Sequence, residues 1–308
     1  MVETNQGRHT LRGVVCVLLG GCCWAFSGSC GQYLFIHSGV SPVWLTAVRM
    51  LLAGCLNTLY MIVYHRAKIK ALISRPRDCL IMLFYAIFGL MLTQYTYFEA
   101  IRCTNAGTAT VLEYIGPVLI MVIVCIGARR LPTIKESIAI VCVVLGIFLI
   151  ATHGRLDTLI ISPEGLFWGL FSSVAMVFYT LLPRSITPKY GAVMVTGLGT
   201  LLGGIAFFLL MRPWPLIISL PPESLLALGG IVFIGTIAAF PLYLQGVNDL
   251  GAVKASMLAS IEPVAATVFS VVWLGSTFVL QDLLGFACII ATVYLLAEPG
   301  GEKFPETP

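Results

Sequence analysis

Three glutamates lie inside long apolar stretches of the chain, where a charged side chain is costly. Glu99, Glu113 and Glu262 are flanked on both sides by apolar residues. An ionisable group at membrane depth is a candidate functional group by default, because its charged form needs a partner there. The chemistry open to such a carboxylate is to carry a proton or to hold a substrate amine.

Depth along the apolar runs ranks the three carboxylates. Glu262 lies about ten residues, or roughly 15 Å, from the nearer end of its run, which places it near the middle of a bilayer. Glu113 lies about seven residues into its run, and Glu99 lies near the end of its own. Structural alternatives stay open: Glu262 can bond a backbone group that Pro263 leaves free, and Glu99 can pair with Arg102 among the headgroups.

Aromatic and amide side chains at similar depth could complete a cavity around these carboxylates. A metabolite cavity needs apolar walls with a few polar groups, which we expect from Trp24, Gln94, Tyr95, Tyr97, Tyr179, Tyr243 and Gln245. Core packing is the alternative for any one of these aromatic residues. The aspartates and histidines fall at the ends of the apolar runs, where we expect them to be solvated.

The elements that must position these residues are membrane helices. The chain has 308 residues, of which 58% are apolar and only 10% charged, and its mean hydropathy is +0.97. Soluble domains have about 25% charged residues, so this composition excludes them. Runs of about 17 to 25 apolar residues can each cross a bilayer as a helix. We count ten, at 12–36, 43–64, 79–102, 106–127, 134–152, 164–184, 191–211, 225–247, 252–274 and 281–298, several of them interrupted by Pro117, Pro241 and Pro263.

Several residue patterns exclude other classes of protein. The ten cysteines lie almost all inside apolar runs without a CxxC pair, so we interpret them as small buried residues. The basic residues form no stripe, which excludes nucleic-acid binding. The chain has no HExxH, GxSG or nucleotide-binding motif and no deep pair of aspartates, which argues against an intramembrane enzyme and against ATP-driven transport. We expect no catalytic residue, no cofactor and no metal.

Basic residues predict the orientation, because cytoplasmic loops retain lysine and arginine. With the N-terminus inside, fourteen Lys and Arg residues lie on the inner side, and three, Arg102, Arg155 and Arg212, lie on the outer side. We therefore predict a multi-pass protein of the plasma (inner) membrane with both termini in the cytoplasm. Arg49, near the start of the second run, either snorkels to the outer interface or is the one basic residue that could reach the cavity.

The chain contains an internal repeat. A shift of 146 positions aligns the third to fifth runs with the eighth to tenth, and it pairs Gly89 with Gly235 and Pro117 with Pro263. Because five is odd, two five-helix halves must cross the membrane in opposite senses, which is typical of secondary transporters. The resulting boundaries are an N-terminal segment 1–11, a first repeat 12–152, a linker 153–163, a second repeat 164–298 and a tail 299–308.

Prolines and small residues indicate where the helices bend and where they touch. Pro117 and Pro263 loosen two helices at equivalent points of the halves, and paired breaks of this kind indicate a binding site. Gly21, Ala25 and Ser29 recur every four positions, and such a face lets helices approach closely in lipid.

Short motifs in order along the chain resemble a known family. They are Cys23–Gly28 (CWAFSG), Tyr97–Ile101 (YFEAI), Leu112–Pro117 (LEYIGP) and Ser260–Pro263 (SIEP). This chain resembles the EamA-type members of the drug/metabolite transporter superfamily over about residues 12–298. The resemblance implies ten helices in an inverted five-helix repeat, a central cavity between the halves, and small metabolites, often amino acids, as cargo. The family often has a Glu after the fourth and ninth spans, where this chain has Arg129–Arg130 and Gly275–Ser276.

The sequence therefore predicts an all-α polytopic membrane protein of ten transmembrane helices in two inverted repeats. We expect a secondary transporter that moves a small metabolite, an amino acid or related compound, by alternating access, with export favoured. The alternative is an antiporter of lipophilic or quaternary cations, which deep carboxylates and aromatic rings also suit. The expected partners are the substrate, the lipid bilayer and, as a candidate coupling ion, the proton. We expect a monomer or a weak dimer.

Overall fold

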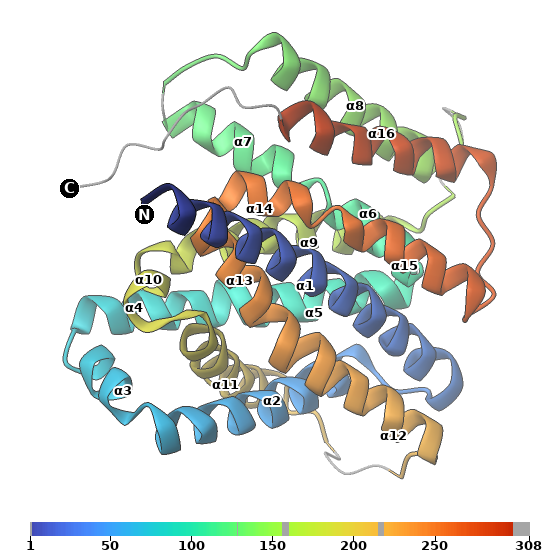
Figure 1. Ribbon diagram of the computed structural model, residues 1–308. Helices are drawn as coiled ribbons and strands as arrows, with labels where there is room; N and C mark the ends of the chain where they lie inside the picture. Colours follow the sequence, from blue (N-terminus) through green and yellow to red (C-terminus); the bar gives the residue numbers. More distant parts are fainter. Residues whose placement is uncertain (1, 128, 156–159, 215–218, 298–308) are drawn as a thin grey trace.

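The computed structural model of the chain is a bundle of long helices that run between two faces (Figure 1). The structure describes residues 2–127, 129–155, 160–214 and 219–297. The predicted tail 299–308 and Asp157 of the predicted linker lie outside these residues. The start of α1, the short helices α3 and α10 and the end of α16 lie on one side of the bundle, which we call the N-terminal face (left in Figure 1).

Each half of the described chain contains five long helical segments joined by shorter helices and turns. The first half contains α1 (Val2–Ser38), α2 (Pro42–Tyr64), α3 (Arg66–Ile73), α4 (Pro76–Phe84), η1 (Tyr85–Met91), α5 (Leu92–Cys103), α6 (Ala106–Glu113), α7 (Gly116–Gly127) and α8 (Ile134–Thr152). The second half contains α9 (Pro163–Leu181), η2 (Leu182–Ser185), α10 (Thr187–Tyr190), α11 (Ala192–Met211), α12 (Pro222–Gly229), η3 (Gly230–Ala238), α13 (Ala239–Leu250), α14 (Ala252–Leu258), α15 (Ile261–Val272) and α16 (Leu280–Ala297).

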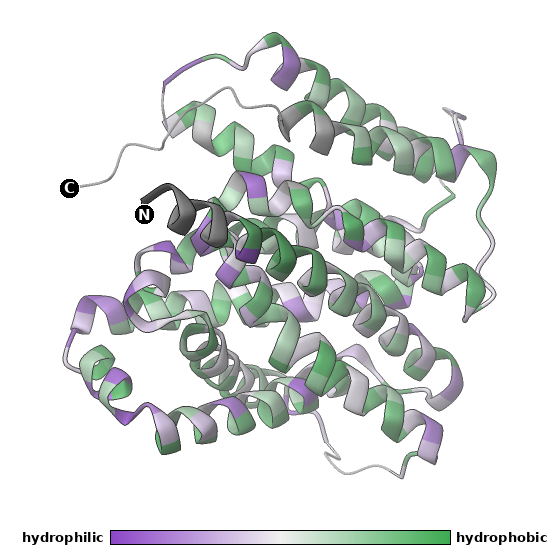
Figure 2. Cartoon of the chain, in the orientation of Figure 1, coloured by the Kyte–Doolittle hydropathy of each residue, from purple (hydrophilic) through white to green (hydrophobic). Residues whose placement is uncertain are grey.

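Nine helical segments of the described chain are long and apolar enough to cross a membrane. Their ends agree with the first nine predicted runs to within three residues. The tenth run corresponds to α16, in which the shorter stretch Leu280–Ala291 is apolar. Apolar residues cover most of the helix surfaces, and hydrophilic residues gather near α3 and the helix ends (Figure 2). This distribution is what a surface surrounded by lipid requires.

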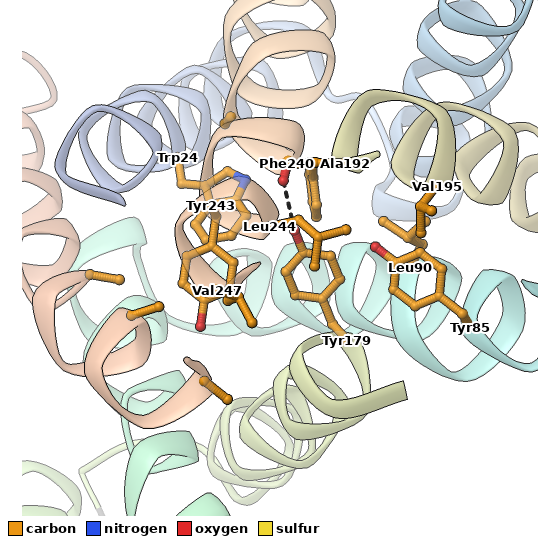
Figure 3. Packing of buried hydrophobic residues seen from close by; sticks show 14 of the residues in the cluster. Trp24, Tyr85, Leu90, Tyr179, Ala192, Val195, Phe240, Tyr243, Leu244 and Val247 are labelled. Atoms are coloured by element: carbon orange, nitrogen blue, oxygen red, sulfur yellow. Dashed lines mark hydrogen bonds between the residues drawn. The ribbon is translucent and has the colours of Figure 1, made fainter. Parts of the chain in front are cut away.

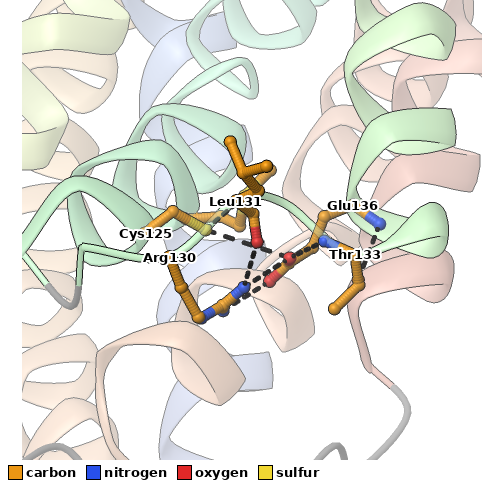
Figure 4. Close-up of polar contacts among 6 residues, drawn as sticks. Cys125, Arg130, Leu131, Thr133 and Glu136 are labelled. Atoms are coloured by element: carbon orange, nitrogen blue, oxygen red, sulfur yellow. Dashed lines mark hydrogen bonds and ion pairs between the residues drawn. The ribbon is translucent and has the colours of Figure 1, made fainter.

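Four spans begin at a side chain that caps the helix. The capping oxygen accepts a hydrogen bond from a backbone N–H in the first turn, which satisfies a donor that the helix itself leaves free. The capping residues are Ser41, Asn105, Thr133 and Ser162. At Thr133 the cap is reinforced, because Glu136 accepts from the Thr133 backbone at 2.6 Å and from Arg130 at 2.8 Å (Figure 4). Arg130, at the departure from the family pattern, thus fixes the turn between α7 and α8.

The two halves pack against each other helix by helix. The close pairs are α1 with α13, α2 with α11, α5 with α9, α6 with α15, and α8 with α16. Glycine permits the closest of these approaches: a Cβ at Gly54 of α2 would lie 2.6 Å from the Leu201 Cα of α11. The pair α8 and α16 lies at the edge of the bundle (Figure 1).

The fourth and ninth spans are broken at matching points. Helix α6 ends at Glu113 and α7 starts at Gly116, whereas α14 ends at Leu258 and α15 starts at Ile261. Pro263 lacks the N–H that would bond the carbonyl four residues earlier. That carbonyl, on Ala259, accepts from the Glu262 N–H at 2.8 Å and from the Tyr114 hydroxyl. One broken helix thus satisfies a backbone group of the other, which a break inside a membrane requires.

The third and eighth spans carry π-helical segments, η1 and η3, at positions that the 146-residue shift also matches. Pro241 follows η3 within α13, which runs on without a break. The prediction that Pro241 interrupts its span is therefore wrong, because the helix continues past the proline. The wider π turns before it accommodate the hydrogen bond that the proline cannot donate. Such segments are frequent near functional sites.

Candidate functional site

A narrow cavity lies where the two broken helices meet. It is lined by residues of both halves: Trp24, Ser27, Arg49, Thr93, Gln94, Tyr97, Glu113, Met176, Phe240 and Glu262. These residues belong to the first, second, third, fourth, sixth, eighth and ninth spans. Its volume is about 30 Å³ when measured at the centres of water-sized spheres, so it has space for a few water molecules. The cavity must widen before it can hold a metabolite.

The two deepest carboxylates both face this cavity. Glu113 is the last residue of α6, and its Oε1 accepts from the Ser172 hydroxyl of α9 at 2.7 Å. Glu262 lies in the first turn of α15 and is only 2% exposed. A negative charge is favoured at a helix N-terminus and disfavoured at a C-terminus. Glu262 is therefore supported by its own helix, whereas Glu113 needs a cation nearby.

Arg49 also lines the cavity, so the interpretation that it snorkels to the outer interface is wrong. The residue is 3% exposed, and its guanidinium carbon lies 4.6 Å from the Phe98 ring centroid and 5.7 Å from the Phe240 ring centroid. It lies seven residues into α2, or about 10 Å along the helix, which is too deep to reach the interface. With Glu113 and Glu262, it gives the cavity a formal charge of −1.

Several buried polar atoms at the cavity have no hydrogen-bond partner in the described chain. Both amide atoms of Gln94, the Trp24 Nε1, the Thr93 Oγ1 and the Arg49 Nε are in this state. Buried polar groups in proteins are almost always paired, and an unpaired group is costly. Their gathering around one cavity therefore indicates a place that a polar ligand or water can fill.

Aromatic rings pack together beside the cavity (Figure 3). The Trp24 ring centroid lies 5.1 Å from that of Phe240 and 5.0 Å from that of Tyr243. Tyr179 packs against the same rings, and its hydroxyl donates to the Phe240 carbonyl at 3.0 Å. The predicted residues Trp24, Tyr179 and Tyr243 thus come together, although Tyr179 and Tyr243 form the wall behind Trp24 and Phe240.

A larger groove opens on the N-terminal face between α2 and α11 on one side and α1 and α13 on the other. It has a volume of about 560 Å³ and extends to Pro241, the residue next to Phe240. Gln245 lines this groove and donates to Asp249 at 2.9 Å. The expectation that Gln245 belongs to the cavity is therefore not met, because it lies one turn closer to the face.

Tyr95 and Glu99 lie outside the cavity as well. Tyr95 packs between Trp168 and Phe207, with ring centroids 5.5 Å and 5.2 Å away. Glu99 accepts from Arg102 at 2.7 Å, which is the alternative considered for it from the sequence. Arg102 also donates to Glu164 at 2.6 Å, so the acidic cluster of Glu99, Cys103 and Glu164 already contains a cation.

The described aspartates are paired, and the expectation that they are solvated is wrong. Asp249 accepts from Arg12 at 2.7 Å, and Asp78 accepts from Lys189 at 3.1 Å and from the Tyr190 hydroxyl at 2.8 Å. These contacts join α1 to α13 and α4 to α10 near the N-terminal face. Asp282 is paired with His153 at 2.9 Å. All ten cysteines are free.

Comparisons with known proteins agree with this architecture. The profile of the EamA-like transporter family matches residues 11–152 and again residues 163–297. This chain belongs to the EamA-like transporter family. It is 33% identical over 288 residues to a protein of Salmonella typhimurium named as an uncharacterized inner membrane transporter, YicL, covering 94% of this chain and 96% of that one. The repeated family match falls on the two halves that the 146-residue shift had separated.

More distant relatives are similar along most of their length. An uncharacterized transporter of Archaeoglobus fulgidus is 27% identical, with 72% of this chain and 77% of the relative covered. YcbK of Bacillus subtilis, also named as an uncharacterized transporter, is 20% identical, with 92% of each chain covered. A solved crystal structure shares the fold with a TM-score of 0.65 at 18% identity, covering 94% of this chain and 97% of the other.

Sequence reasoning left the place of Arg49 open and missed one structural tyrosine, Tyr114. Arg49 shares a polar face of α2 with Thr46 and Asn57, all of them buried, and this spacing of three and eight residues was the available signal. Tyr114 is buried and bonds Ala259 across the two halves. That contact depends on how two distant helices cross, so no local pattern could reveal it.

Proposed function

We propose that this EamA-like transporter is a secondary carrier of the inner membrane that moves a small metabolite, an amino acid or related compound, by alternating access. The observation that carries the proposal is the cavity at the two broken helices, which residues of both halves line together. A shared site of this kind can be exposed to either side when one half rocks against the other. The inner-membrane location is supported by the name of the Salmonella relative.

The charge of the cavity supports a cargo that carries an amine. Glu113 and Glu262 are buried there with a single cation, and no described ion pair joins Arg49 to either of them. A substrate ammonium group would supply the missing positive charge next to Glu113, at the unfavourable end of α6. The rings of Trp24 and Phe240 would cover the apolar part of the cargo.

The groove on the N-terminal face supports export as the direction. With the N-terminus in the cytoplasm, as the basic residues predict, the groove of about 560 Å³ opens toward the cytoplasm. The groove reaches Pro241, next to Phe240 of the cavity lining, and the ring of Tyr243 lies beside Trp24 there. Cargo would then load from the inside once these rings move.

A lipophilic-cation antiporter is the second candidate, and the formal charge of −1 at an aromatic cavity favours it. A lipophilic cation carries a positive charge but has no carboxylate that could pair with Arg49. Its presence in the cavity would place two cations, the cargo and Arg49, close together. Amino-acid transport therefore suits the cavity better, and tetraphenylphosphonium serves as the probe for the alternative.

Counterflow in proteoliposomes tests the proposed function. The purified protein is reconstituted with each of the twenty L-amino acids at millimolar concentration inside, and uptake of the same radiolabelled compound is followed. We expect at least one amino acid to exchange at ten or more times the rate of empty liposomes, and Glu113→Gln to abolish this exchange. Glu223→Gln, at the exposed start of α12, is the matched control and should exchange normally.

Two results would contradict the proposal. Exchange of tetraphenylphosphonium without exchange of any amino acid would favour the cation antiporter. An unchanged exchange rate in Glu113→Gln would mean that the cargo does not pass through this cavity.

A further inference from the structure

We propose that Arg49 and Gln94 form an anion subsite that binds the carboxylate of the cargo. The cargo is then a zwitterion, held across the cavity between this subsite and the acidic side chains of Glu113 and Glu262. The inference rests on the proposed transport function and narrows its substrate class. It assigns Arg49 the role of specificity-determining residue.

Arg49 is buried without a direct ion pair in the described chain. It is 3% exposed, its Nε has no hydrogen-bond partner, and its guanidinium lies over the rings of Phe98 and Phe240. Ring faces compensate a buried cation only in part. An unpaired buried charge is strongly destabilising, so a residue retained in this state fits a ligand anion that completes it.

The second step is that Gln94 lies beside Arg49 and is also unpaired. Gln94 is 1% exposed, and neither its Oε1 nor its Nε2 has a partner in the described chain. It lies one helical turn before Phe98, the ring over which Arg49 lies at 4.6 Å. Residues four apart lie on the same face of a helix. An amide donor and a planar guanidinium thus face one region of the cavity, and both groups bind carboxylates well.

The third step is that the positive and negative groups of the cavity stay apart. Arg49 comes from α2, Glu113 from α6 and Glu262 from α15, and no described ion pair within 4.0 Å joins the arginine to either glutamate. Charges buried in one cavity would pair directly if they could reach each other. A zwitterion with its carboxylate on Arg49 and its ammonium on one glutamate pairs the arginine and one acid, and it leaves the other glutamate for a proton.

Matched analogues test this assignment. Binding to the purified full-length protein is measured for leucine, phenylalanine and lysine, each beside its amine (3-methylbutylamine, phenethylamine and cadaverine) and its acid without the α-amine. For the tightest-binding amino acid we expect a Kd at least tenfold lower than for its amine and for its acid. Equal binding of amino acid and amine would overturn the inference, because the carboxylate would then not be recognised.

Two substitutions locate the recognition at the subsite. Arg49→Gln should weaken amino-acid binding at least tenfold while changing amine binding less than threefold. Gln94→Glu should also weaken amino-acid binding at least tenfold and change amine binding less than threefold. Because the new carboxylate gives Arg49 a buried partner, this variant should stay folded even if Arg49→Gln does not. Preserved discrimination between amino acid and amine in a folded variant of either kind would overturn the assignment.

Failure of this inference is distinguishable from failure of the proposed function. If amino acids and their amines exchange equally well in proteoliposomes and Arg49→Gln alters neither, the carrier function stands and the anion subsite is wrong. If no amino acid and no amine exchanges, the proposed function itself is wrong. Thr46→Val, on the same face of α2 but outside the cavity lining, is the control and should leave the discrimination intact.

Discussion

At the scale of single residues, the two cavity glutamates are not equivalent. Glu262 begins the half-helix α15, and Glu113 ends the half-helix α6. Their positions also differ within the repeat, because the 146-residue shift places Ala259 opposite Glu113 and Gly116 opposite Glu262. The halves share a backbone architecture but not a charge pattern, and this asymmetry allows one carboxylate to hold cargo while the other serves coupling.

Glu262→Gln tests the coupling role. The charged and titratable groups near Glu262 are Glu113, Arg49 and Tyr97 in the cavity lining and Tyr114 in the broken turn of the fourth span. We expect the variant to lose transport driven by a pH gradient at least tenfold and to keep most of its exchange at equal pH, because Glu113 remains to hold the amine. Transport in proteoliposomes with and without a gradient measures both. Normal gradient-driven transport would make Glu262 structural, and loss of exchange as well would make it an amine ligand.

Depth in an apolar run was enough to find the two cavity glutamates and Trp24, because burial of a charge is visible in sequence. It was not enough for Arg49, since a long basic side chain near a helix start is compatible with either interface or interior. It also placed Tyr95, Glu99 and Gln245 at the cavity, although they lie on faces of α5 and α13 that point elsewhere. Depth is a property of the sequence, whereas direction depends on how helices cross.

At the scale of elements, the broken turns of the fourth and ninth spans support each other. The Tyr114 hydroxyl occupies the acceptor that Pro263 leaves free on Ala259. Tyr114→Phe removes this bond, and Ala259 keeps only the weaker bond from the Glu262 N–H at 2.8 Å. We expect a loss of about 1 kcal/mol in unfolding free energy, measured by SDS denaturation in mixed micelles.

The control for this change is another tyrosine without the cross-helix bond. The ring of Tyr33 stacks on Trp273 with centroids 5.7 Å apart, and no hydrogen bond from its hydroxyl is described. Tyr33→Phe should therefore change the unfolding free energy by less than about 0.5 kcal/mol. Equal losses for the two variants would contradict the bracing role of Tyr114.

The approach of α1 to the broken ninth span depends on Gly21. A Cβ there would lie 2.8 Å from the Ile261 side chain and 3.3 Å from the Ala259 carbonyl. We expect Gly21→Ala to cost about 1 to 3 kcal/mol by overpacking and to slow exchange. Gly229→Ala in α12, where a Cβ meets nothing within 4 Å, should be neutral or stabilise by up to about 1 kcal/mol. SDS denaturation of both variants measures the difference, and equal effects would contradict close packing at Gly21.

The spans themselves were predictable because length and hydropathy are local properties, and the observed ends agree with the predicted runs. The position of the paired breaks was predictable because Pro117 and Pro263 recur in register. The π-helical segments η1 and η3 were not, since π turns leave no compositional signal of their own. Pro241 indicated that the eighth span is irregular, but it did not indicate a π-helical segment.

At the scale of the whole molecule, each half supplies one partner to every close helix pair. The cavity lies among these pairs with the aromatic rings of Trp24, Tyr179, Phe240 and Tyr243 beside it, and the groove opens on the N-terminal face. The ion pair of Arg12 with Asp249 joins α1 to α13 on that same face. A change of access therefore requires the halves to move around the cavity while these contacts rearrange.

The central claim is that one cavity is reached from both sides of the membrane in turn. A Thr93→Cys variant in a background without native cysteines places a single thiol in the cavity, and Thr46→Cys, buried in α2 outside the lining, is its control. Labelling by a membrane-impermeant thiol reagent is measured in right-side-out and in inverted vesicles, with and without the exchanged amino acid. We predict labelling of Thr93→Cys in both orientations, slowed by the amino acid in both, and none of Thr46→Cys. Labelling from one side only, or labelling that the amino acid does not affect, would contradict alternating access through this cavity.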